Sequence, residues 1–156
     1  MIVLVRAAAV LVASLGIYRM AVVPLRSNLV LREVELRTLT ALTLDVQHAA
    51  VLARTNLEEL QRAAAGSQLD PSWYLLRGVN LEILERWQEA ADAYTQALRI
   101  DDRPEIYVNR GLVMMRVGRM DAAIRDLATA ARFDPNVLKR IDGETRTRVA
   151  QAAGLP

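Results

Sequence analysis

A repeat with a period of 33 residues is the feature that most constrains the fold of this chain. When residues 71–103 are aligned with residues 104–136, nine positions are identical. The shared pairs are Pro71/Pro104, Tyr74/Tyr107, Arg77/Arg110, Gly78/Gly111, Arg86/Arg119, Ala90/Ala123, Ala97/Ala130, Arg99/Arg132 and Asp101/Asp134. A fixed period of this length is typical of a solenoid, in which each repeat buries its apolar face against its neighbours. The sequence therefore predicts two stacked units over residues 71–136.

The repeated residues resemble the tetratricopeptide repeat (TPR), a pair of antiparallel helices of about 34 residues. Both copies have an aromatic residue at position 4, glycine at position 8 and alanine at positions 20 and 27. The glycines and alanines permit close contact between the two helices of a repeat, and the large residues fill the space beside them. Two departures are arginine at position 7 of both copies, and Glu85 where the second copy has Gly118. The resemblance implies an all-α, TPR-type solenoid of helical hairpins with two clear repeats.

The remaining segments are expected to extend this helical array. The composition of 24 alanines and 23 leucines, with only seven glycines, favours helices. Apolar residues three or four positions apart predict amphipathic helical structure over 27–66, as one long helix or as a hairpin broken near Thr43 to Asp45. We favour the hairpin, because Asp45 is a suitable N-cap for a second helix. Solenoids of this kind need about three repeats and a polar cap. We therefore expect residues 27–66 to form a degenerate helical pair. Residues 67–156 are expected to form the two repeats, followed by a capping helix over 137–153.

The N-terminal segment, residues 1–26, is predicted to be an apolar helix for membrane anchoring or assembly. Residues 1–25 are apolar apart from Arg6, Ser14 and Arg19. The run 7–18 would span about 18 Å as a helix, against roughly 30 Å of bilayer hydrocarbon, so a span requires an arginine to extend to the interface. Two other readings stay open at this point: a cleaved signal peptide, and a helix in the core of a filament of identical subunits.

Composition and charge argue against several classes of function. The chain has no cysteine, one histidine (His48) and four serines, which disfavours thiol chemistry, Cys/His zinc sites and most nucleophile triads. Asp101 and Asp102 fall in a turn between repeats and are expected to be turn residues. Arginines are interleaved with acidic residues, whereas a nucleic-acid binder concentrates them on one face. We therefore expect no enzyme, no cofactor or metal, no nucleic-acid partner and no small-molecule substrate.

The resemblance places the candidate binding surface on the concave side of the array, which the first helix of each repeat lines. The residues of these first helices that are expected to line the concave side are Leu75, Val79, Glu82, Val108, Asn109, Leu112 and Met115. This mainly apolar wall suits an amphipathic helix, either from a partner or from residues 46–65 of this chain. Trp73 lies off the repeat pattern and is a candidate interface anchor.

Two functions from different classes follow. In the first, the chain is a TPR scaffold for protein–protein interaction, anchored by residues 1–25 in a bacterial cell envelope. In the second, it is a self-assembling subunit of an extracellular filament or pilus-like polymer, with the N-terminal helix in the core. The partner is accordingly either another protein or identical subunits, and the contact through residues 1–25 is either with the membrane or within a homo-oligomer.

Overall fold

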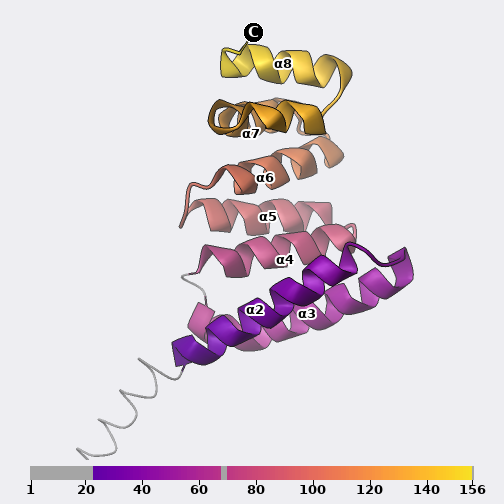
Figure 1. The fold of residues 1–156 in the computed structure, drawn as a ribbon, viewed down its shortest axis with the longest axis vertical. Coiled ribbons are helices and arrows are strands. Elements are labelled where there is room, and N and C mark those ends of the chain that lie inside the picture. The colour runs from indigo at the N-terminus through magenta and orange to yellow at the C-terminus, as the bar shows by residue number, and fades with distance from the viewer. Residues whose placement is uncertain (1–22, 68–69, 156) are drawn as a thin grey trace, which may run out of the picture.

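The described part of the chain is a stack of helices. The computed structural model describes residues 23–67 and 70–155, and these ranges contain no strand. Its elements are α2 (Val23–Ala41), α3 (Val46–Ser67), α4 (Pro71–Ile83), α5 (Trp87–Leu98), α6 (Pro104–Arg116), α7 (Met120–Phe133), the 3-10 helix η2 (Pro135–Arg140) and α8 (Gly143–Ala153). The stack runs from α2 and α3 at one end to α8 at the other (Figure 1). The expected all-α fold class is confirmed.

Local sequence explains where the repeat helices begin. Pro71 and Pro104 occupy the first turns of α4 and α6, where a missing N–H leaves no intrahelical bond unmade. The Asp70 side chain accepts a hydrogen bond from the Ser72 backbone N–H at 2.8 Å, which caps α4. Each repeat therefore starts its first helix at the same point of the pattern.

The helices of each repeat approach closely at a glycine. A Cβ atom placed on Gly78 of α4 would lie 2.6 Å from Cζ of Tyr94 on α5. A Cβ atom on Gly111 of α6 would lie 2.8 Å from Cγ of Leu127 on α7. Both distances are shorter than a side chain tolerates, so glycine is what allows Tyr94 and Leu127 to pack fully buried against the facing helix.

Helices α2 and α3 form a hairpin that packs on α4. The chain turns at residues 42–45, and the Asp45 side chain accepts hydrogen bonds from the backbone N–H groups of Gln47 and His48 at the start of α3. A small apolar core joins α2, α3 and α4; its buried members are Leu31, Val34, Leu60, Trp73 and Leu76. The hairpin thus occupies the position of a further unit at the N-terminal end of the stack.

A buried polar cluster links the same three helices. Asn80 of α4 donates to the Thr38 hydroxyl of α2 at 2.8 Å, and Asn56 of α3 donates to the Asn80 side-chain oxygen at 3.0 Å. Thr38 donates in turn to the Val34 carbonyl at 2.8 Å. Because buried polar groups are costly when unpaired, these bonds favour one register of the hairpin on α4.

The two arginines at position 7 depart from the TPR pattern, and an ion pair within the chain explains one of them, Arg110. The Arg110 guanidinium donates two hydrogen bonds to the Asp126 carboxylate of α7, at 2.7 and 2.8 Å, and a third to Thr95 of α5 at 3.2 Å. The carboxylate raises the pKa of Arg110. A single charged residue therefore ties α6 to the helices on either side of it.

The C-terminal segment differs from the expected capping helix over 137–153. Asp134 accepts a hydrogen bond from the Asn136 N–H at 2.9 Å and starts the short helix η2, and α8 begins only at Gly143. Val137, Ile141 and Val149 are buried against α6 and α7. The cap is thus made of two short helices joined by two extended residues, Ile141 and Asp142, rather than one continuous helix.

Among the described helices, none has both the length and the apolar character that crossing a bilayer requires. The predicted anchor falls almost entirely on residues 1–22, which lie outside the described residues. That prediction therefore stays a prediction.

The two turns within repeats yield a reciprocal test. Glu85 and Gly118 occupy equivalent positions and both have positive φ, 57° and 76° respectively. A side chain in this conformation costs roughly 1–2 kcal/mol, whereas glycine adopts it freely. We expect Glu85→Gly to raise the free energy of unfolding by about 0.5–1 kcal/mol, after the entropy that glycine adds to the unfolded chain. We expect Gly118→Ala to lower it by about 1 kcal/mol.

Urea unfolding followed by circular dichroism measures both changes. A Cβ atom at Gly118 would meet nothing within 4 Å, so its effect reports conformation rather than a clash. Equal stability of wild type and both variants would contradict the account of these turns.

Candidate functional site

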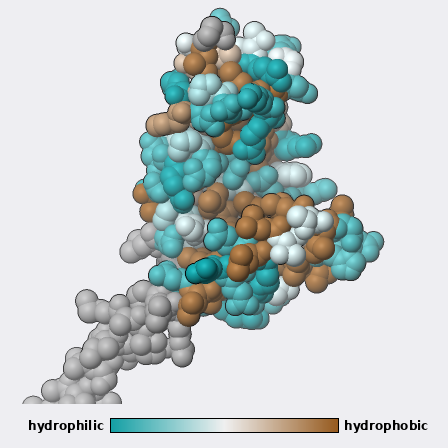
Figure 2. All heavy atoms as spheres, viewed as in Figure 1, coloured by the Kyte–Doolittle hydropathy of each residue, from teal (hydrophilic) through white to brown (hydrophobic). Residues whose placement is uncertain are grey.

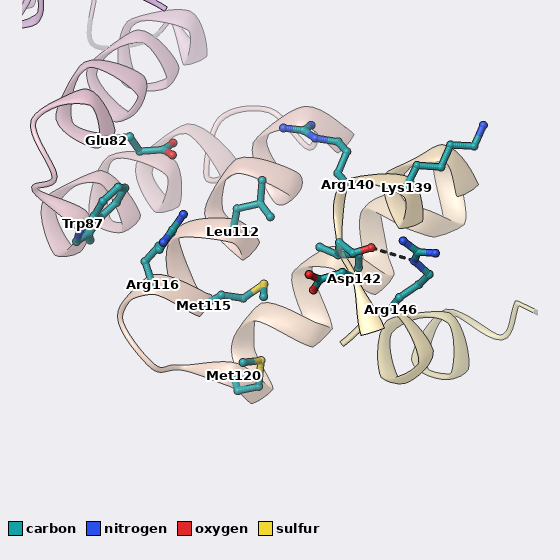
Figure 3. Close-up of a pocket in the computed structure, with 11 residues that line it drawn as sticks. Glu82, Trp87, Leu112, Met115, Arg116, Met120, Lys139, Arg140, Asp142 and Arg146 are labelled. Carbon is teal, nitrogen blue, oxygen red and sulfur yellow. Dashed lines mark hydrogen bonds between the residues drawn. The ribbon is translucent and has the colours of Figure 1, made fainter. Parts of the chain in front are cut away.

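The candidate site is a pocket on one side of the stack, beside α4 and α6. It has a volume of about 600 Å³ and lies between the C-terminal ends of α4 and α6 on one side and η2 with the start of α8 on the other (Figure 3). Three of the predicted binding residues, Glu82, Leu112 and Met115, line it together. The repeat positions therefore bring part of the predicted wall into one cavity.

The side chains of this pocket combine an apolar lining with a charged rim. Leu112, Met115 and Met120 lie side by side along one wall, facing the η2–α8 segment (Figure 3). Trp87 contributes an aromatic ring, and the Arg116 guanidinium lies over it at 5.8 Å from the ring centre. Such a lining can accept an apolar side chain of a ligand while leaving polar groups at the edge.

Positive charge predominates around the pocket. Four basic residues line it, against two acidic ones; they are Arg116, Lys139, Arg140 and Arg146, and Glu82 and Asp142. The Arg146 Nε donates to the Ile141 carbonyl at 2.9 Å, which fixes this side chain at the rim. Arg140 extends towards the Glu82 side of the pocket, and Lys139 extends away from it (Figure 3). The arrangement favours ligands that carry negative charge.

Glu82 is held in place by a buried tyrosine. The Tyr94 hydroxyl, from α5, donates a hydrogen bond to the Glu82 carboxylate. Burial raises the pKa of Glu82, and this effect exceeds the lowering by the Tyr94 hydrogen bond and by the charge of Arg140. Burial and the neighbouring carboxylate raise the pKa of Tyr94 as well. The contact with Gly78 that buries Tyr94 therefore also positions Glu82, one of the two acidic residues of the pocket.

The other predicted wall residues lie elsewhere. Leu75 lines a second pocket of about 340 Å³ between α2 and the start of α4. Val108 is buried and faces Val137 of η2 in a third pocket. Val79 and Asn109 are half-buried, and Val79 packs on the core between α4 and α6. Among the described residues, the predicted wall residues that line a pocket thus divide among three separate pockets.

Two expectations about this surface require correction. Residues 46–65 do not cover the predicted wall of α4 and α6, because they form α3, which packs within the stack. The region around Val108 is covered by η2 instead. Trp73, the candidate interface anchor, is only 6% exposed and donates its indole N–H to the Leu60 carbonyl at 2.8 Å. Trp73 therefore anchors α4 to α3 inside this chain.

Sequence reasoning missed the basic residues of the pocket. Arg140, Asp142 and Arg146 are exposed, as expected of a polar cap, but the repeat pattern does not indicate that they line a pocket. The bend at Ile141, between η2 and α8, brings this segment to the pocket beside α6. Asp142 is the N-cap residue of α8 and has extended backbone angles, but its side chain makes no capping hydrogen bond.

Other candidate groups have structural partners. His48 is exposed and pairs with Asp45 at the start of α3. Asp101 pairs with Arg103 at 2.8 Å in the turn before α6. Within residues 23–67 and 70–155, no group of three or more potential metal ligands comes together.

Comparison with known proteins adds no assignment. No protein-family model matches this chain, and no curated protein matches it.

The raised pKa of Glu82 predicts a pH-dependent effect of its replacement. The folded state favours the protonated carboxyl, so its contribution to stability is full below the ordinary glutamate pKa and is lost as the pH rises through the raised value. Glu82→Gln keeps an acceptor for the Tyr94 hydroxyl and has no charge to bury. We expect this variant to gain stability relative to wild type as the pH rises from 4 to 8.

The measurement is the urea midpoint at each pH. Glu35→Gln, at an exposed position of α2, is the matched control and should show no such trend. A stability difference between Glu82→Gln and wild type that stays constant over this pH range, or that shifts in favour of wild type as the pH rises, would refute the burial of this carboxyl.

Proposed function

We propose that this protein is a non-catalytic scaffold for protein–protein interaction, built as a TPR-type solenoid and held at a bacterial membrane by its N-terminal segment. The sequence repeat and the matching layout of α4–α5 and α6–α7 support the TPR assignment. On this view α2–α3 is the degenerate first unit and η2 with α8 is the cap. The proposal requires no catalytic group.

The pocket between α4, α6 and the η2–α8 segment is the observation that carries this proposal. An apolar side chain of a partner fits between Leu112 and Met115, and acidic side chains beside it can pair with Arg116 and Arg146. A peptide segment with an apolar anchor and flanking acidic residues is the ligand that this chemistry suits.

The membrane part of the proposal rests on the sequence of residues 1–25. This segment contains Arg6 and Arg19 but no acidic residue, and its central run 7–18 is uncharged. Lipid can accommodate it if the arginines extend to the interface. The same segment is what a filament of identical subunits would bury, so the experiment must separate the two assemblies.

Photo-cross-linking from the pocket tests the scaffold function. A benzophenone amino acid replaces Leu112 in the full chain, produced in its own cells, and replaces Asp92 on the exposed side of α5 as the control. We expect a discrete adduct from position 112 that is absent from position 92. Arg116→Glu in the same chain should reduce the adduct about tenfold, because it places like charges against an acidic ligand.

The identity and pattern of the adducts decide the outcome. A different protein that is trapped only from position 112, and lost with Arg116→Glu, supports the scaffold. An adduct between two copies of this chain supports the filament subunit instead. Equal adducts from both positions, or none from position 112, would contradict the proposed binding site.

A further inference from the structure

The first hairpin of the stack exposes far more apolar surface than the rest of the described chain. The described chain has nine exposed large hydrophobic residues, and seven of them belong to α2, α3 and the turn between them. These are Leu29, Leu36, Leu39, Leu42, Leu44, Val46 and Val51. Figure 2 shows brown, hydrophobic residues gathered over this hairpin. A terminal unit of a solenoid ordinarily presents a polar outer face, so this surface is one that another body should cover.

Three leucines of α2 form a row on the side of this helix that faces away from the core. Leu29, Leu36 and Leu39 are 61%, 59% and 57% exposed, and Arg32 lies between the first two. Steps of three and four residues place the three leucines on one face of a helix, with Arg32 at its edge towards the pocket between α2 and α4 and Glu33 at its other edge. The opposite face is the one that packs, through Leu31, Val34, Thr38 and Ala41. We call Leu29, Arg32, Leu36 and Leu39 the outer row.

The apolar surface continues beyond the outer row into the turn. Leu42 and Leu44 are exposed there, and the chain carries no charged residue between Arg37 and Asp45. Arg37 itself faces the other way, where it pairs with Glu59 of α3 and with Glu33 at 3.2 Å. The outer row and the turn thus make a mainly apolar edge, with Arg32 in the row and the exposed Glu33, which pairs with Arg37, beside it.

The place of this surface in the chain points to its occupant. The apolar run 7–18 ends a few residues before α2 begins at Val23. If that run holds the chain in a bilayer, α2 starts at the membrane surface, and its outer row covers about 15 Å of a helix that is about 28 Å long. Covalent attachment gives the row a high effective concentration at the lipid surface.

Charge at the start of the chain also fits a lipid surface as this occupant. The first 32 residues contain Arg6, Arg19, Arg26 and Arg32, and the first acidic residue is Glu33. Basic residues near an anionic bilayer contribute to binding, and arginine stems pack on apolar surface while their head groups reach phosphate.

We propose that the outer row of α2, with the adjoining turn, docks on the lipid surface of the membrane. The inference rests on the proposed tether of residues 1–25. The apolar leucines enter the interface, and Arg32 meets lipid phosphate. In this orientation the rest of the stack stands away from the membrane, since α8 is at the end opposite to α2 and α3 (Figure 1).

Site-specific fluorescence on the full chain tests this docking. The chain contains no cysteine, so one introduced cysteine takes one environment-sensitive NBD label. The test positions are Leu29→Cys, Leu36→Cys and Leu39→Cys, and the controls are the exposed positions Asp92→Cys and Gln151→Cys. Each protein is reconstituted into vesicles of phosphatidylcholine and phosphatidylglycerol, with and without lipid that carries a doxyl quencher, and vesicle flotation is measured in parallel.

We expect a blue shift and a loss of emission by doxyl lipid at the three α2 positions, and neither change at the two controls. If the chain floats with vesicles while the α2 labels stay in water, the docking is overturned and the tether stands. If the chain does not float, the tether fails and the docking with it. If the α2 labels are shielded at high protein concentration but unaffected by doxyl lipid, a second copy covers the row and the proposal is overturned.

Discussion

The close approach of α4 to α5 at Gly78 is the contact on which the fold and the site both depend. It lets the Tyr94 ring pack fully buried against the backbone of α4, and the Tyr94 hydroxyl then fixes Glu82 at the pocket. Gly111 repeats the approach with Leu127 in the next hairpin. Because interiors are close-packed, a space of one hydrogen atom at these positions sets the distance between helices. The pocket inherits its shape from that distance.

The repeated pattern predicted the hairpins because it encodes this approach directly, through glycine and alanine facing large residues. Asp45 was a suitable N-cap, and the structure begins α3 after it. The polar cluster of Thr38, Asn56 and Asn80 was not predictable in the same way. Its members come from three helices, and nothing in the local sequence distinguishes a buried asparagine from an exposed one. Pairing of Arg110 with Asp126 escaped prediction for the same reason.

The candidate site was also predicted only in part. Glu82, Leu112 and Met115 were predicted, because the repeat fixes which side of α4 and α6 they occupy. The basic rim was not, since its position depends on where η2 ends and α8 begins, and Ile141 turns the chain there. In the sequence, the exposed leucines of α2 cannot be distinguished from the buried ones, because both fit an amphipathic pattern. Only the packing of α2 on α3 and α4 separates the leucines that are buried from those that are left outside.

Gly78→Ala is the most direct test of the contact on which the account rests, because two effects of opposite sign meet there. On an ordinary helix surface alanine stabilises by about 1 kcal/mol relative to glycine. At this position a methyl group must displace the Tyr94 ring, an overpacking that costs about 3 kcal/mol. The account predicts a net loss of about 2 kcal/mol in urea unfolding, reduced in a Tyr94→Leu background. A variant as stable as wild type, or more stable, would contradict it.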